Sequence, residues 1–598
     1  MNAEGAVDAF GTGVQGVFLF DTRHVSDLGW NLAGFDLLHT DTSTTEITHF
    51  WSKTSEHELK LLIKRRLTLH PTGLTDSLEI ENACLTAQNF DAAPRMSADF
   101  VDVFALRGHN GFHQTGSHET VEEGALRRFT YTAPDGVVSE TVVQIEGLDP
   151  GTVLVIGPRK THQITVTYCF SSSLLTVGRD DQTPILPFDP ASIRQDSPAV
   201  ARARSDIAAL LLTSGEGPVP AAGIPNFVTV FGRDSLITAW LLLEPMPDLA
   251  RNTLRYLAAR VGRTVDPSRD EQPGRILHEV RLGEMSRLKA IPFGLYYGTA
   301  DANALFLRLL GDYCDRHGPA LAIELREVWI AVVGWIEVMI ARRGYVAFTE
   351  GDGKGLVIKS WKDSNDSMHY ADGQLATHDI AGVELQGYAY AGFLAAARLA
   401  AHCGFAESQA QAWRNKADAF ATHFNADFWM EEHQTYALGI DGEGRQLDVN
   451  ASNAGHLLWT GIVPEPRQKI LVARLFQDDL WSGWGIRTLG TREARYNPLS
   501  YHNGSVWPHD NAMIAAGLLA CGFPAEFERI RAALHDLALT QGDLRLPELF
   551  GGYARATHPP LPYLESCRPQ AWAAAALLYL ETAKAPVLQT ADRGTDAA

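Results

Sequence analysis

The chain has 598 residues, of which 45% are hydrophobic and 20% are charged, and its formal net charge is −20. This length exceeds one ordinary domain and fits one large domain with a smaller one. The acidic balance repels nucleic acid and anionic lipid, so we expect neither nucleic acid nor a membrane as a partner. It suits a neutral substrate.

The six cysteines are scattered along the chain and form no CxxC pair. This spacing predicts isolated thiols, and we expect no bound metal or cofactor. The N-terminal MNAEGAVDAFGTG has neither the basic nor the apolar region of a secretion signal, and the apolar segment 329–340 is too short for a membrane span. We therefore expect a cytoplasmic protein. The oligomeric state stays open, with a homo-oligomer as one alternative.

Residues 1–185 are predicted to form an antiparallel β-sandwich domain. Several short β-rich runs in this region are separated by turn residues, and Pro134-Asp135-Gly136 joins two of them as a hairpin. Short strands at such close spacing are typical of a sandwich. The runs cover 57–70, 126–133, 137–146 and 152–170.

Residues 186–215 are predicted to be a linker that includes a helix of its own. The stretch 186–200 is rich in Pro and Asp, and an Ala/Leu-rich helix is expected over 199–212. Beyond it, apolar residues recur at three- and four-residue spacing, which predicts amphipathic helices. These helices are expected over 234–246, 248–261, 301–317, 319–342, 379–402, 406–424, 450–461, 466–477, 505–521, 524–539 and 569–584.

The predicted helices follow one another in pairs joined by short turns, which makes the chain mainly α. Eleven or twelve helices in successive hairpins fit an (α/α)6 barrel over 216–584, in which an inner ring lies within an outer ring. An α-solenoid is the main alternative, but no repeat of fixed length is visible. The polar tail 585–598 is predicted to be disordered.

Polar and aromatic residues are concentrated in eight loops, each just before or at the start of a predicted helix. Aromatic rings can stack on the C–H faces of sugars, while Asp, Arg, His and Asn can bind adjacent hydroxyls. A single Trp before a helix is more simply a packing residue, but eight such loops in one domain favour a shared sugar site. The loops are 223–238, 274–284, 296–303, 359–373, 383–388, 481–488, 496–511 and 546–570.

The same loops resemble those of a known family. The strings FGRDSLITA (231–239), SWKDSNDS (360–367), YNPLSYHNGSVWPHDNAMIAAG (496–517) and LPEL with CRPQAWAA (546–549, 567–574) are similar to bacterial amylo-α-1,6-glucosidase-type proteins. Those proteins are related to the glucosidase half of glycogen debranching enzyme. The string GVFLFDTRHVSDLGWNLAG (16–34) resembles their β-rich N-terminal domain. The resemblance implies an (α/α)6 barrel and inverting hydrolysis by an Asp/Glu pair.

The resemblance also implies which carboxylates act. The family's acid is an Asp in a Trp-x-Asp string, which here is Asp363, and its base is a Glu in a Pro-Glu-Leu string, which here is Glu548. Glycosidic cleavage needs such a pair, because one carboxylic acid protonates the leaving oxygen while the second acts as base or nucleophile. Asp366 and Glu384 stay open as alternatives for the acid, and Glu565 for the base.

The other polar and aromatic side chains of these loops are the predicted sugar ligands. The family usually has an aromatic residue where this chain has Asn226, which predicts an altered sugar specificity. A Ser505/His509/Asp510 triad is a weaker alternative, because no nucleophile-elbow string is present. The predicted ligands are Asn226, Phe231, Arg233, Asp234, His278, Glu279, Trp361, Lys362, Asp366, Glu384, Gln386, Trp484, His502, Asn503, Trp507, His509 and Gln570.

Together these features predict an exo-acting, anomer-inverting glycoside hydrolase that cleaves an α-glucosidic or related bond of an oligosaccharide or small glycoside. A sugar phosphorylase or uronate-glycoside lyase on the same barrel is one alternative. A phosphorylase would need an anion pocket, for which the candidates are Arg233, Arg275 and Arg281. A non-catalytic carbohydrate-binding protein is the other alternative, and the intact Asp/Glu pair argues against it.

Overall fold

The computed structural model describes residues 6–7, 14–43, 45–55, 58–109, 111–149, 153–174, 186–189, 193, 196–349, 355–377 and 379–583. The tail 585–598, predicted to be disordered, lies outside the described residues. The chain forms two compact units, one of Met1–Thr183 with Arg281–Gly294 and one of Pro184–Val280 with Leu295–Ala598. Within the described residues, no helix has the length and apolar character that crossing a membrane requires.

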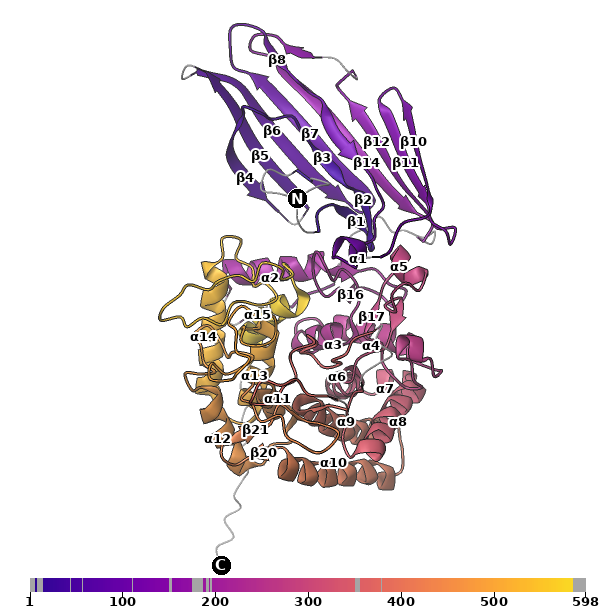
Figure 1. The fold of residues 1–598 in the computed structure, drawn as a ribbon, viewed down its shortest axis with the longest axis vertical. Coiled ribbons are helices and arrows are strands. Elements are labelled where there is room, and N and C mark those ends of the chain that lie inside the picture. Colours follow the sequence, from indigo (N-terminus) through magenta and orange to yellow (C-terminus); the bar gives the residue numbers. More distant parts are fainter. Residues whose placement is uncertain are drawn as a thin grey trace, which may run out of the picture. The chain divides into compact units, whose positions relative to one another are not determined.

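The first unit is built on an antiparallel sheet (Figure 1). Side chains alternate between core and surface along its central strands 73–82 and 161–172, so that Ile80 and Ile164 face the core, as expected for a half-buried sheet. In spatial order the eight strands are β10 (Ser117–Glu123), β11 (Leu126–Thr132), β12 (Val138–Glu146), β14 (Thr161–Ser172), β7 (Gly73–Asn82), β6 (Glu58–His70), β5 (Glu46–Ser55) and β4 (Asp36–Thr42).

Short two-stranded ribbons complete this unit. Val25 and Trp30 of the ribbons belong to the same apolar core as Ile80 of the large sheet. The unit is therefore sheet-rich, with one large sheet and ribbons that share its core, and the predicted hairpin is confirmed by the pairing of Thr132 with Val138. The ribbons pair β1 (Val17–Leu19) with β2 (Thr22–Val25), β3 (Asp27–Trp30) with β9 (Pro94–Ser97), and β8 (Gln88–Phe90) with β13 (Leu154–Ile156); the unit also holds helices α1 (Val103–Leu106) and α5 (Glu284–Arg287).

A buried ion pair crosses the large sheet between β6 and β7. Arg65 Nε and Nη2 donate to the two carboxylate oxygens of Asp76 at 3.0 and 2.8 Å, and the two side chains are 1% and 2% exposed. Trp30 Nε1 donates to the same carboxylate at 2.8 Å. The carboxylate is therefore the acceptor for three buried donors.

Replacing Asp76 with Ala is expected to lower the free energy of unfolding by about 3–5 kcal/mol, because it leaves the Arg65 charge buried without its carboxylate. Urea unfolding of the variant and the wild type measures the difference. Asp41→Ala on β4 is the matched control, since the Asp41 carboxylate is 72% exposed and its removal should change stability by less than about 1 kcal/mol. Equal stability of the two variants would contradict the prediction.

Six helices of the second unit contact one another in a closed ring, α15 returning to α3. We refer to them as the ring helices. Nearly every residue of α13 and α15 is buried, as expected for helices that are surrounded by protein. In chain order the ring helices are α3 (Gly232–Leu241), α6 (Ala302–His317), α9 (Val383–His402), α11 (Asn453–Thr460), α13 (Pro508–Ala520) and α15 (Ala571–Thr582).

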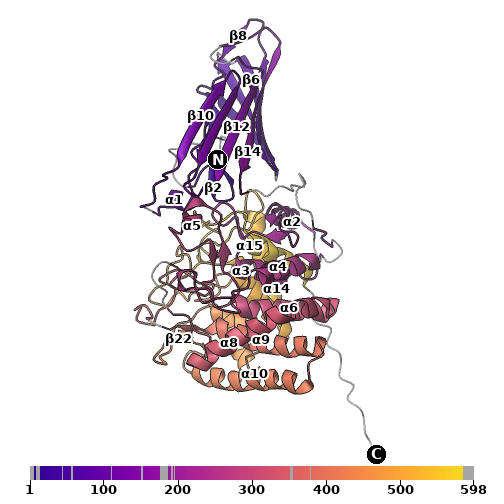
Figure 2. The same ribbon diagram turned by 90° about the vertical axis from the view of Figure 1, so that its right-hand side faces the viewer.

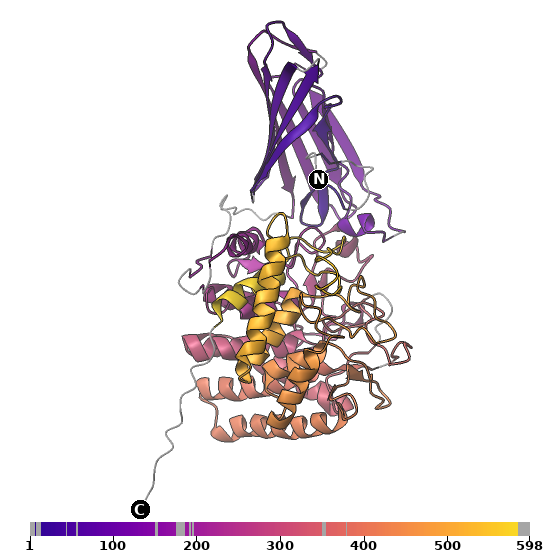
Figure 3. The same ribbon diagram turned by 90° about the vertical axis from the view of Figure 1, so that its left-hand side faces the viewer.

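Other helices cover the ring helices and expose one face. In α10 the buried residues Trp413, Ala417, Phe420 and Phe424 recur at three- and four-residue spacing, which gives one apolar stripe. Figure 2 shows α9 beside α10. Figure 3 shows the helices of this unit from the opposite side. The covering helices are α2 (Pro198–Ala209), α4 (Pro247–Ala259), α8 (Arg326–Arg343), α10 (Glu407–Asp427), α12 (Glu465–Leu475) and α14 (Pro524–Thr540).

The helix predicted over 319–342 is divided. It forms α7 (Ala320–Glu324) and α8, and Leu325 between them has φ −94° and ψ 17°, outside the helical range. The side chain of Leu325 is nevertheless buried, which explains why its apolar character continued the sequence pattern across the break. The other predicted helices are present with ends shifted by a few residues.

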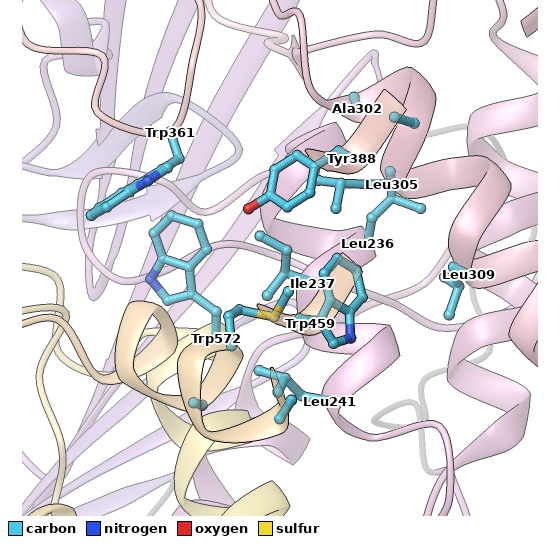
Figure 4. Close-up of a cluster of buried hydrophobic side chains, with 14 of the residues drawn as sticks. Leu236, Ile237, Leu241, Ala302, Leu305, Leu309, Trp361, Tyr388, Trp459 and Trp572 are labelled. Carbon is cyan, nitrogen blue, oxygen red and sulfur yellow. The ribbon is translucent and has the colours of Figure 1, made fainter. Parts of the chain in front are cut away.

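The core of the second unit fills the ring (Figure 4). Aliphatic side chains such as Leu236 of α3 and Leu305 of α6 meet the aromatic rings of Tyr388, Trp459 and Trp572 from the other ring helices. The ring is therefore a packed core and not a channel.

Candidate active site

Each ring helix has a buried polar residue at its N-terminus. Arg233 of α3 pairs with Asp301 of α6, and Asn453 of α11 donates to Glu384 of α9 at 2.9 Å, so these N-termini meet at one end of the ring. The partial positive charge of a helix N-terminus favours carboxylates there. The six residues are Asp234, Asp301, Glu384, Asn453, Asp510 and Gln570.

Arg233 connects the candidate acid to the ring helices. Its Nη1 donates to Asp301 Oδ2 at 3.0 Å and its Nη2 donates to Asp363 Oδ2 at 2.9 Å. The side chains of Arg233 and Asp301 are 3% and 0% exposed, whereas that of Asp363 is 28% exposed. Asp363 is thus the member of this network that a substrate can reach.

Two of the carboxyl groups around Arg233, those of Asp363 and Asp234, hold a proton more tightly than isolated ones. Burial raises the pKa of Asp363, although the Arg233 charge opposes this shift. Burial also raises the pKa of Asp234 to about 8, against the opposing charge of Arg233 and with further increases from the charges of Asp363, Glu548 and Asp301. Three carboxyl groups share one guanidinium, and the raised pKa values of Asp234 and Asp363 favour their protonated forms, as acid catalysis requires.

Glu548 lies among hydrogen-bond donors. Glu548 is 2% exposed. Tyr501 Oη donates to Glu548 Oε1 at 2.8 Å, and the Cys567 N–H donates to Glu548 Oε2 at 3.1 Å. Gln570 Nε2 lies 3.4 Å from Oε1. Donors to both oxygens favour an ionised carboxylate, which is the state that a catalytic base needs.

Asn226 lies in a tight turn next to the Glu548 loop. Gly223 and Phe227 pair across this turn, and the Arg568 N–H donates to the Ile224 carbonyl at 2.8 Å. A Cβ atom on Gly223 would lie 1.7 Å from Gln570 Oε1, so only glycine fits against this side chain. The structure therefore places the turn that holds Asn226 against Gln570, whose amide lies 3.4 Å from Glu548.

His502 and Asn503 contact the turn that follows Asp363. The Ser364 N–H donates to His502 Nδ1 at 3.2 Å, and Asn503 Nδ2 donates to Asp366 Oδ2 at 3.0 Å. Asp366 also lines an open polar cavity of about 460 Å³ together with Asp372 and Arg495. Asp366, the alternative acid, is therefore separated from the Arg233 network and held by Asn503.

The predicted aromatic ligands pack against one another. Trp361 lies parallel to His456 with ring centroids 6.0 Å apart, and His509 lies parallel to Trp572 at 3.6 Å. Trp507 contacts Trp361 edge to face at 5.7 Å. These rings are buried and support the loops of the site, so a direct contact between them and a sugar stays a prediction.

Three other predicted ligands are buried beneath the site. Lys362 Nζ donates to the Thr488 carbonyl at 2.6 Å, and burial lowers the pKa of Lys362 to about 8. Burial raises the pKa of Glu384, which accepts from Asn453. Gln386 bonds the backbone N–H and carbonyl of Val346, so its amide stabilises the fold and is not available to a sugar.

The remaining predicted ligands lie on walls of the site or away from it. Phe231 pairs with Glu279, and its ring lies edge to face with that of His278 at 5.4 Å, which forms one buried wall. Trp484 donates to the His558 carbonyl at 3.3 Å, and the Arg555 guanidinium lies 4.4 Å from its ring. It thus contacts neither catalytic candidate. Glu565, the alternative base, is exposed.

Sequence reasoning missed two residues of the site. Asp301 and Tyr501 both lie in the loops that were selected, but neither was among the predicted ligands. Asp301 caps an apolar helix, and a buried Asp at that position indicates a cationic partner such as Arg233. Tyr501 gave no signal of its own, because its contact with Glu548 joins residues that are 47 positions apart.

Two family models match the chain. Residues 1–169 match the N-terminal domain of (some) glycogen debranching enzymes. Residues 340–556 match the mannosylglycerate hydrolase MGH1-like glycoside hydrolase domain. The chain is a glycoside hydrolase. Both Asp363 and Glu548 lie within the matched hydrolase domain, and the predicted likeness of this glycoside hydrolase to the glycogen debranching group is confirmed.

Solved structures similar to this glycoside hydrolase have low sequence identity to it. A GH63 mannosylglycerate hydrolase from Thermus thermophilus in complex with Tris is 14% identical, covers 64% of this chain and 99% of its own, and has a TM-score of 0.48. A GH78 family rhamnosidase of Bacillus sp. GL1 is 14% identical, covers 82% of this chain and 49% of its own, and has a TM-score of 0.45. No curated protein sequence matches the chain.

Proposed function

We propose that this glycoside hydrolase is an exo-acting, anomer-inverting enzyme with Asp363 as the acid and Glu548 as the base. The observation that supports the pair best is Tyr501. Burial raises its pKa well above the usual value, and the charges of both Glu548 and Asp363 raise it further. Tyr501 Oη donates to Glu548 Oε1 at 2.8 Å, and the next residue, His502, accepts the N–H of Ser364, which follows Asp363, at 3.2 Å. Two neighbouring residues thus contact the segments of both carboxylates, which supports an acid and a base that face one substrate.

In the proposed reaction, Asp363 gives its proton to the glycosidic oxygen while the bond from that oxygen to the anomeric carbon breaks. A water molecule attacks the anomeric carbon from the opposite face and gives its proton to Glu548, which inverts the configuration. The environments of the two groups support these roles. Burial favours the protonated form of Asp363, and the donors around Glu548 favour the ionised base.

Exo action and the barrel belong to the same proposal. The closed ring of helices supports an (α/α)6 barrel over 216–584 as the catalytic domain, preceded by a domain over 1–185. Side chains fill the ring, so a sugar bound at the N-terminal ends of the ring helices would meet packed side chains on the ring side, which favours action on the end of a sugar chain. The proposed substrate is an α-glucoside or related glycoside, and Asn226, in a turn that pairs with residues 568–570, is proposed to adapt the site to its particular sugar.

The phosphorylase alternative receives no support from the arginines. Arg233 is bound to Asp301 and Asp363, Arg281 to Asp21 at 2.9 Å, and Arg275 donates to the Thr299 carbonyl at 2.9 Å. None of the three candidate cations of the anion pocket is therefore left for phosphate. Hydrolysis of a glycoside panel should proceed equally with and without inorganic phosphate.

Inversion is tested by proton NMR of the first sugar released. For an α-glycoside, the β-anomer is expected to appear first and then to equilibrate with the α-anomer, because water attacks opposite to the leaving group. The spectra are recorded within the first minutes of turnover, and a retaining α-glucosidase is run on the same substrate as the control. Appearance of the α-anomer first would exclude Glu548 as an inverting base.

A further inference from the structure

We propose that Tyr501 is a positioning residue for the base, and that the tripeptide Tyr501-His502-Asn503 forms a clamp that ties Glu548 to the turn carrying Asp363. This inference rests on the proposed function, because it takes Glu548 as the base. Three consecutive residues bind two separate segments of the site. We call residues 501–503 the clamp and residues 363–367 the acid turn.

The clamp contacts both catalytic segments at hydrogen-bonding distance. Tyr501 Oη donates to Glu548 Oε1 at 2.8 Å. The next residue, His502, accepts the Ser364 N–H at its Nδ1 at 3.2 Å. The Asn503 amide donates to both the carbonyl and the carboxylate of Asp366 at 3.0 Å. The relative position of acid and base is therefore set through one short segment of backbone.

The clamp is itself held rigidly. The Tyr501 carbonyl accepts from Ser505 Oγ at 2.7 Å and from Trp507 Nε1 at 2.9 Å. The His502 ring lies nearly parallel to the Trp507 ring, with centroids 5.1 Å apart. At Gly504, φ is +141°, and a Cβ atom there would lie 2.7 Å from the Asn497 carbonyl oxygen. Only glycine fits this turn, so the clamp cannot shift easily.

The protonation states of the two rings suit these contacts. Burial holds the pKa of Tyr501 well above its usual value, so its hydroxyl stays a donor through the working pH range. Burial keeps the pKa of His502 well below its usual value, and the neutral ring can accept at Nδ1. A hydrogen bond from Tyr501 stabilises the ionised form of the carboxylate that accepts it.

Tyr501→Phe removes the donating hydroxyl and keeps the ring. We expect kcat to fall roughly tenfold to a hundredfold, since hydrogen bonds to charged groups have this strength, while KM changes much less. The acidic limb of the kcat/KM profile should move to higher pH, because that limb reports ionisation of the base in the free enzyme. Tyr563→Phe is the matched control, since the Tyr563 ring packs 5.6 Å from that of Tyr501. It should leave the rate and the pH profile as in the wild type.

A double-variant cycle separates positioning from a general structural effect. If Tyr501 acts through Glu548, then Tyr501→Phe combined with Glu548→Gln is no slower than Glu548→Gln alone. Multiplied losses, or a Tyr501→Phe enzyme with wild-type rate and pH profile, would overturn the role of Tyr501. A fully active Glu548→Gln enzyme would instead refute the proposed function, so the two failures are distinguishable.

Discussion

Replacing Asp363 with Asn is expected to lower kcat about a thousandfold, within the range that general acid catalysis contributes. Asn keeps the size of the side chain, and its carbonyl oxygen can still accept the bond that Arg233 Nη2 now donates at 2.9 Å. It has no acidic proton to give to the leaving oxygen. Steady-state rates on the best substrate of a glycoside panel measure the loss, and calorimetric titration should give sugar binding within a few-fold of the wild type.

The leaving group provides an internal control for this variant. A glycoside whose leaving group is already a weak base needs little protonation, so Asp363→Asn should lose much less activity on such a substrate than on a disaccharide. Asp366→Asn is the matched variant on the same turn, because its carboxylate binds Asn503 and not Arg233. A thousandfold loss in Asp366→Asn, with an active Asp363→Asn enzyme, would exchange the two roles.

Much of the fold could be predicted from the sequence, because its signals are local. A β-rich composition between turn residues marked the run 57–70, which forms β6 from Glu58 to His70. The turn at Gly136, where φ is +83°, marked the hairpin between β11 and β12. The chain segment Arg281–Gly294 could not be assigned in this way, because its place in the first unit depends on partners such as Asp21 that lie about 260 residues away.

For the candidate site too, local features could be predicted from the sequence and long-range contacts could not. Residue types and loops were predictable, since sugar chemistry needs carboxylates, aromatic rings and amides in one place. The partners within the site were not, because Arg233 reaches Asp363 across 130 residues of chain. The burial of individual side chains could not be predicted from the sequence either. Trp361 and His509 have the composition of a sugar platform, but long-range packing covers them.

Replacing Glu548 with Gln is expected to lower kcat by about the same thousandfold factor, because Gln cannot take the proton from the attacking water. The substitution also removes one of the two hydrogen-bond acceptors at position 548. Glu548 now accepts from Tyr501 and from the Cys567 N–H, and a Gln side chain has one oxygen that can accept and one NH₂ group that cannot. Glu565→Gln is the matched control, since Glu565 is exposed and lies 17 positions further along the chain. We expect that variant to keep wild-type activity.

A smaller side chain at position 548 allows a test of the face from which the nucleophile attacks the sugar. In Glu548→Ala, azide is an anion that attacks without giving up a proton, so it should restore turnover and form a glycosyl azide. Since the attack comes from the face that Glu548 occupies, an α-glycoside should yield the β-azide. Azide should not restore turnover of the Asp363→Asn variant, because that variant cannot give a proton to the leaving oxygen. Rescue of that variant, or an α-azide from Glu548→Ala, would show that Glu548 does not lie on the water side of the bond.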